Sequence, residues 1–130
     1  SSKIGDRTLP PSVWKAMQDA PRITLSAPLQ ARAQYLAQAY EDISADQKRL
    51  SEALTKLIPI QGRERIEAWR SLAAAGQFPE LAAALMEHHY DPRYARQREQ
   101  RGATTQQEVR LSDLTPTSIA IAAREIAAAL

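Results

Sequence analysis

Apolar residues recur at helical spacing along most of this chain. From Leu29 onward they return every three or four positions, which places them on one face of successive helices. Trp14 and Trp69 lie on such faces, and we expect both to be packing anchors. The pattern predicts a block of helices over residues 29–101 in which each helix buries one side.

Glycine, proline and capping residues mark where these helices begin and end. Gly76 is placed as a left-handed cap, so the helices on either side of it should form a hairpin. Ser44 and Gln47 have the spacing of a capping box, in which each side chain satisfies a free backbone N–H near the other. Asp91 followed by Pro92 has the form of an N-cap and a first helical residue, which predicts that a new helix starts there.

Two short segments, residues 22–26 and 108–111, have the composition of strands. The helical block lies between them, and a long connection of this kind is what parallel strands require. The apolar spacing over residues 115–130 predicts a closing helix with almost no polar face. Its apolar stripe would consist of Ile119, Ala123, Ile126 and Leu130. We therefore expect a mostly-α fold with two short parallel strands, a helical insertion over residues 29–101 and a closing helix.

The composition restricts the class of protein. At 130 residues the chain is expected to be a single domain, residues 1–130. Its net charge is only +2, so any function that needs positive charge must depend on a local cluster of basic residues. The absence of cysteine excludes a disulfide, a thiolate nucleophile and a cysteine-bound zinc ion, and it fits the cytoplasm. No apolar run approaches the roughly 20 residues that span a bilayer, so no membrane partner is expected. The sequence opens with Ser1, and we interpret it as a fragment.

The chain has no complete catalytic or nucleotide-binding motif. It contains no G-x-x-x-x-G-K-[ST] loop, no G-x-G-x-x-G after a strand and no G-x-S-x-G elbow. His88 and His89 are neighbours whose side chains would point about 100° apart on a helix, unlike the i, i+4 pair that a zinc-binding helix uses. We therefore assign no catalytic residue, no metal site and no cofactor to this chain.

Residues 88–101 form the segment that is richest in chemical groups. Arginine matches phosphate with a planar fork of donors, and tyrosine offers a face on which a base can stack. The segment is therefore a candidate for contacts to nucleic acid or nucleotide phosphate. The alternative is an ordinary solvent-exposed helix face with ion pairs. The candidate binding residues are Arg93, Arg96, Arg98, Arg101, Tyr90, Tyr94 and His89.

Three stretches, in order along the chain, match the pattern of a known family. They are Ser2–Gly5 with Leu9-Pro10 and Trp14-x-x-Met17, then A-P-x-I-x-L-x-A-P-L-x-A-R over residues 20–32, then H-Y-D-P-x-Y over residues 89–94. Together they resemble the tRNA 2-selenouridine synthases. The resemblance runs from Ser2 to about Tyr94, and the remaining tail fits the family's last strand and helix.

The resemblance implies an enzyme of two parts, a rhodanese-like domain with a catalytic cysteine and a P-loop domain, that acts on 2-thiouridine at the tRNA wobble position. Sulfur would be replaced by selenium through a geranylated intermediate, with selenophosphate and geranyl diphosphate as substrates of the full-length enzyme. This chain would be the distal part of the P-loop domain. Its implied partners are tRNA and the missing N-terminal rhodanese-like and P-loop parts of the same protein.

The same resemblance gives the arginine-rich segment a role. Helices inserted before the last strand of related P-loop folds act as a lid, so its arginines would contact tRNA backbone or a substrate diphosphate while its tyrosines position the helix or stack. The chain alone is expected to be inactive, because it lacks the cysteine and the phosphate loop. The alternative function is a non-enzymatic helical module whose apolar last helix docks onto a partner protein.

Overall fold

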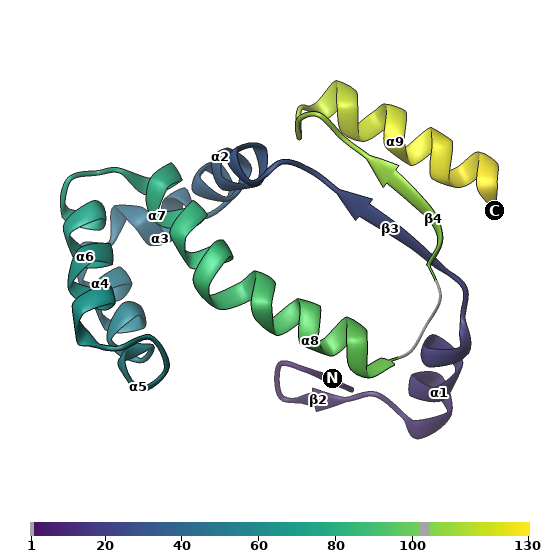
Figure 1. Cartoon of the computed structure of the whole chain (residues 1–130), viewed down its shortest axis with the longest axis horizontal. Coiled ribbons are helices and arrows are strands. Elements are labelled where there is room, and N and C mark those ends of the chain that lie inside the picture. Colours follow the sequence, from purple (N-terminus) through teal and green to yellow (C-terminus); the bar gives the residue numbers. More distant parts are fainter. Residues whose placement is uncertain (1, 102–104) are drawn as a thin grey trace.

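The computed structural model describes residues 2–101 and 105–130, and it is mostly helical (Figure 1). The helices are α1 (Pro11–Asp19), α2 (Leu29–Ala39), α3 (Glu41–Ala45), α4 (Gln47–Thr55), α5 (Ile58–Gln61), α6 (Arg63–Ala74), α7 (Phe78–Leu85), the π-helical turn η1 (Met86–Tyr90), α8 (Asp91–Arg101) and α9 (Pro116–Ala129). The strands are β1 (Lys3–Ile4), β2 (Arg7–Thr8), β3 (Arg22–Ser26) and β4 (Thr105–Arg110). The predicted mostly-α class is confirmed.

Strands β3 and β4 form a parallel pair, as the long helical connection predicted. Leu25 lies beside Val109 in this pair, and the bounds of β3 are the predicted ones. Strand β4 begins at Thr105 and not at residue 108, and it ends at Arg110. A second sheet, the antiparallel pair β1–β2, was not predicted because two residues per strand carry no alternation; Gly5, with φ of 59°, lies between its strands.

The main core lies in the helical lobe, which we define as α2 to α7, residues 29–85. It is formed by side chains of α4, α6 and α7 that are almost completely buried, namely Leu54, Ile66, Trp69, Ala73 and Leu81. Removing such apolar surface from water contributes about 25 cal/mol per Å², so this cluster is the chief source of the lobe's stability. Trp69 is the packing anchor that was predicted, whereas Trp14 in α1 is only half buried.

Of two predicted helix ends, the structure confirms one and contradicts the other. Gly76 adopts a φ of 70° between α6 and α7, so the predicted left-handed cap is confirmed. The predicted capping box is wrong. Asp46 caps α4 by accepting the Arg49 backbone N–H at 3.0 Å, while the Ser44 hydroxyl donates to the Glu41 carbonyl at 2.9 Å. The reason is that Ser44 lies inside the short helix α3, where its hydroxyl bonds back into its own turn.

The predicted helix start at Asp91 is also wrong, because α7, η1 and α8 follow one another without a break. Pro92 has no N–H, and its ring cannot sit against the carbonyl four residues back, that of His88. The backbone widens into a π-helical turn just before the proline, and the Asp91 N–H bonds to the Met86 carbonyl five residues earlier. A single wide turn therefore accommodates the proline inside a long helix.

Helix α9 lies beside β4 (Figure 1), and the face that it buries is different from the one predicted. Ala122 and Val109 are buried, with 6% and 2% of their surface exposed. Of the predicted stripe, Ile126 is half buried, and Ile119, Ala123 and Leu130 are exposed. The helix therefore buries the side that carries Ala122 and Ile126, and most of the predicted stripe faces solvent.

Figure 1 shows the helical lobe at one end of the molecule and the β3–β4 pair with α9 at the other. Helix α8 leaves the lobe as a long arm and leads the chain back toward β4. Among the described residues, no helix combines the length and the apolar character needed to cross a membrane.

Candidate functional site

An ion pair joins the start of α2 to the start of α8. The Arg32 guanidinium donates two hydrogen bonds to the Asp91 carboxylate, from Nη1 to Oδ1 at 2.8 Å and from Nη2 to Oδ2 at 2.9 Å. This bidentate geometry is the strong form of the interaction. It raises the pKa of Arg32 and lowers the pKa of Asp91, whose carboxylate is favoured further by the nearby charge of Arg98. Both groups are therefore ionised throughout the physiological range.

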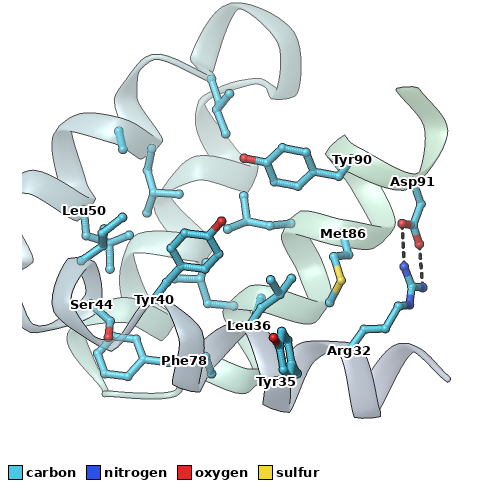
Figure 2. A pocket seen from close by; sticks show the side chains of 18 of the residues that line it. Arg32, Tyr35, Leu36, Tyr40, Ser44, Leu50, Phe78, Met86, Tyr90 and Asp91 are labelled. Atoms are coloured by element: carbon cyan, nitrogen blue, oxygen red, sulfur yellow. Dashed lines mark hydrogen bonds and ion pairs between the residues drawn. The ribbon is translucent and has the colours of Figure 1, made fainter. Parts of the chain in front are cut away.

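A pocket of about 780 Å³ opens beside this ion pair (Figure 2). Its apolar wall is supplied by α2, α4, the turn between α4 and α5, α7 and η1, through Leu36, Leu50, Leu54, Leu57, Leu81, Leu85 and Met86. Polar and aromatic residues complete the lining, and these are Arg32, Tyr35, Tyr40, Ser44, Tyr90, Asp91, Tyr94 and Arg98. The volume and the mixture of an apolar wall with a few polar groups are typical of small-molecule sites.

The charged residues Arg32 and Asp91 lie at one end of the pocket, which we call its polar end. Figure 2 shows Arg32, Asp91 and Tyr90 at that end, with Leu50 and Ser44 toward the opposite end. The tyrosines of the pocket are about half exposed, so their hydroxyls are open to solvent or to a ligand. A molecule with an apolar body and an oxygen-rich head matches this distribution.

The structure separates the candidate arginines. Because a helix turns by about 100° per residue, α8 presents Arg98 and Tyr94 to the pocket and Arg93 to another side. Arg93 lies against His89, with Nη1 3.3 Å from the ring Nε2. Arg96 is exposed and does not line the pocket. Arg101 is the last residue of α8, and its side chain lies outside the described part of the chain.

His89 occupies a different position from the other candidates. Only 5% of its surface is exposed, and its ring meets the Tyr90 ring edge to face at a centroid distance of 4.9 Å. Burial, followed by the charge of Arg93, lowers the pKa of His89. The neutral ring is therefore an interior part of η1, while Tyr90 beside it lines the pocket.

Sequence reasoning missed the residues that other elements bring to this site. Arg32 and Tyr35 come from α2, which had been treated only as a packing helix, and Tyr40 follows directly after it. Gln61 of α5 reaches η1, where its Nε2 donates to the His88 carbonyl at 3.0 Å. The one available signal was the presence of both Arg32 and Asp91 in the stretches that carry the family resemblance.

The arrangement offers a ligand an apolar wall together with charged and hydroxyl groups. The described residues contain no group of three histidine, aspartate or glutamate side chains that could hold a metal ion. In comparisons with known proteins, no family model, no curated protein and no solved structure matches the chain. The function must therefore be argued from the site itself and from the resemblance of its motifs.

Proposed function

We propose that this chain is the distal part of the P-loop domain of a tRNA-modifying enzyme that converts wobble 2-thiouridine to 2-selenouridine through a geranylated intermediate. Its α8 arm and pocket supply contacts to tRNA or to a substrate phosphate, and the reacting groups come from the rhodanese-like and P-loop parts of the full-length enzyme. Selenophosphate and geranyl diphosphate are the substrates of that enzyme, and the cytoplasm, where tRNA is found, is its place of action.

The observation that carries this proposal is the Arg32–Asp91 ion pair. It joins two of the stretches that resemble the synthase family, residues 20–32 and 89–94, although these are far apart in the sequence. Residues that a family needs for one site are expected to converge in the fold. The convergence occurs at the polar end of the pocket, where Arg98 also lies.

The composition of the pocket supports an oxygen-rich ligand with an apolar body. Arg98 lines the pocket, and its charge lies near Asp91, so it is the cation offered to a phosphate. The apolar wall suits the branched hydrocarbon of a geranyl group, so geranyl diphosphate is the ligand that we propose for this pocket.

The tRNA contacts can be tested by neutralising the arm. The variant Arg93→Gln, Arg96→Gln, Arg98→Gln, Arg101→Gln should bind tRNA more weakly than the original chain when titrated at about 50 and 200 mM salt. The slope of log affinity against log salt should decrease by roughly one for each arginine that contacts a phosphate.

A matched control removes the same number of positive charges from other exposed positions. These are Lys48→Gln, Lys56→Gln, Arg63→Gln and Arg124→Gln. The control should keep the original affinity and salt slope. Equal affinity of the arm variant and the control would overturn the tRNA role and favour the helical interaction module, for which the exposed Ile121 and Leu130 of α9 are the supporting observation.

The pocket is tested separately with geranyl diphosphate as the probe. Ala53 lines the pocket and is exposed, so Ala53→Trp should fill the space and weaken binding measured by calorimetry. Ala39→Trp, at an exposed position of α2 outside the pocket, is the control and should bind as the original chain does. Equal binding by both variants would show that the probe does not enter this pocket.

A further inference from the structure

One side chain, that of Gln61, holds the turn η1 against helix α5. Its Nε2 donates to the His88 carbonyl at 3.0 Å, and its Oε1 accepts from Arg65 Nη1 at 2.9 Å. The His88 carbonyl needs this donor, because Pro92 has no N–H to offer to it. The two hydrogen bonds also fix the orientation of the amide, with its NH₂ group toward η1 and its oxygen toward Arg65.

The ring of His89 lies between two donors. Its Nδ1 is 3.3 Å from Gln61 Nε2, and its Nε2 is 3.3 Å from Arg93 Nη1. A neutral imidazole has one acceptor nitrogen to offer to these groups, whereas a protonated imidazole has two N–H groups and no acceptor. Protonation would therefore place a donor against a donor on each side of a ring that is 5% exposed.

The charges around the His89 ring also disfavour its protonation. Arg93 of α8 is the cation next to His89, and Arg65 of α6 stands behind Gln61. Among the described residues, no carboxylate is paired with His89; Glu87 of the same turn lies 3.7 Å from the other histidine, His88. Burial and the Arg93 charge accordingly lower the pKa of His89.

We propose that His89 is a pH-sensitive joint: in mildly acidic solution its ring takes up a proton, and the Gln61 contact that holds η1 against α5 opens. The joint lies at the base of the α8 arm, because η1 is the turn between α7 and α8. The Arg32–Asp91 ion pair, which contains no histidine, continues to tie α8 to α2 when the joint opens.

The direction of the effect follows from the lowered pKa. In the unfolded or locally opened chain the histidine titrates near its ordinary value of about 6.5, and in the closed joint it titrates lower. The closed joint is therefore fully stable above that value and loses stability as the pH falls below it. The population of the open state can rise by up to about tenfold per pH unit until the pKa of the closed joint is reached.

Amide hydrogen exchange at the joint tests this proposal. Protection of the Tyr90 and Asp91 amides, corrected for the intrinsic effect of pH on exchange, should fall by about tenfold between about pH 7.5 and 5.5. Protection of the Ile66 amide in the core of the lobe should change far less. Proton NMR of the His89 ring should give a titration midpoint below about 6.5.

The two adjacent histidines provide a matched pair of variants. His89→Gln should remove the pH dependence, while His88→Gln, at a half-exposed position, should keep it. Arg93→Gln should raise the His89 midpoint and weaken the pH dependence without touching the buried ring. The proposal is overturned if His89 titrates at or above about 6.5, or if His89→Gln folds and retains the pH-dependent loss of protection. Should His89→Gln fail to fold, an unchanged midpoint in Arg93→Gln overturns it.

Discussion

The guanidinium of Arg32 and the carboxylate of Asp91 form two parallel hydrogen bonds, although 59 positions separate the residues in the sequence. The ion pair connects α2, the first helix after β3, to α8, the helix that leads back to β4. Asp91 has helical backbone angles, and its carboxylate accepts from Arg32 and does not cap the helix. The ion pair thus links α8 to α2 beside the pocket.

The contribution of this pair can be measured with a double-mutant cycle. Arg32→Ala and Asp91→Ala should each lower the free energy of unfolding, and the two changes should be coupled by about 1 kcal/mol. The value is modest because 34% and 40% of the two side chains remain exposed to solvent. Urea denaturation of the two single variants and the double variant gives the coupling, and strictly additive effects would contradict an energetic link.

The role of Gln61 can be tested against Pro92. Gln61→Ala should destabilise the chain by about 1 kcal/mol, because the His88 carbonyl loses its donor. In a Pro92→Ala background the same change should cost much less, since residue 92 then provides an N–H for that carbonyl. Thermal denaturation followed by circular dichroism measures both differences. Equal costs in the two backgrounds would mean that the proline does not create the need for Gln61.

Two isoleucines of the helical lobe should contribute very differently to the free energy of unfolding. Ile66 is completely buried against the apolar cluster, so Ile66→Ala should cost about 3 kcal/mol through lost burial and a residual cavity. Ile60 is 62% exposed, and Ile60→Ala should change the free energy of unfolding by less than about 0.5 kcal/mol. Urea unfolding followed by tryptophan fluorescence tests both values. Similar losses for the two variants would place the core elsewhere.

Asp113 should make the start of α9 sensitive to strong acid. Hydrogen bonds from the Ser118 hydroxyl, the Thr115 hydroxyl and the Thr115 backbone lower the pKa of Asp113 from 3.8 to about 2. Since the charged form is favoured in the folded state, its stabilisation is complete above about pH 3.8 and is lost as the pH falls through about 2. Carbon NMR of the carboxyl group reports the midpoint, and a midpoint near 3.8 would contradict the hydrogen-bond network.

Local signals in the sequence predicted several features of the helices correctly. The spacing around Trp69, the glycine at position 76 and the long connection between the two strands predicted a buried helix face, a left-handed cap and parallel pairing, and all three are present. These features depend on residues close together in the chain or on the length of chain between strands. The same signals misplaced a cap at Ser44, where two patterns of hydrogen bonding compete within a few residues.

Composition and order of residues by themselves determined the mostly-α class and the parallel strands. Only the tertiary structure decided that Asp91 would leave its capping position to pair with Arg32, that Arg98 would face a pocket and that His89 would be buried against Gln61. The reason is physical: each of these contacts joins elements whose relative position is set by packing of the whole lobe, and no local pattern encodes that position.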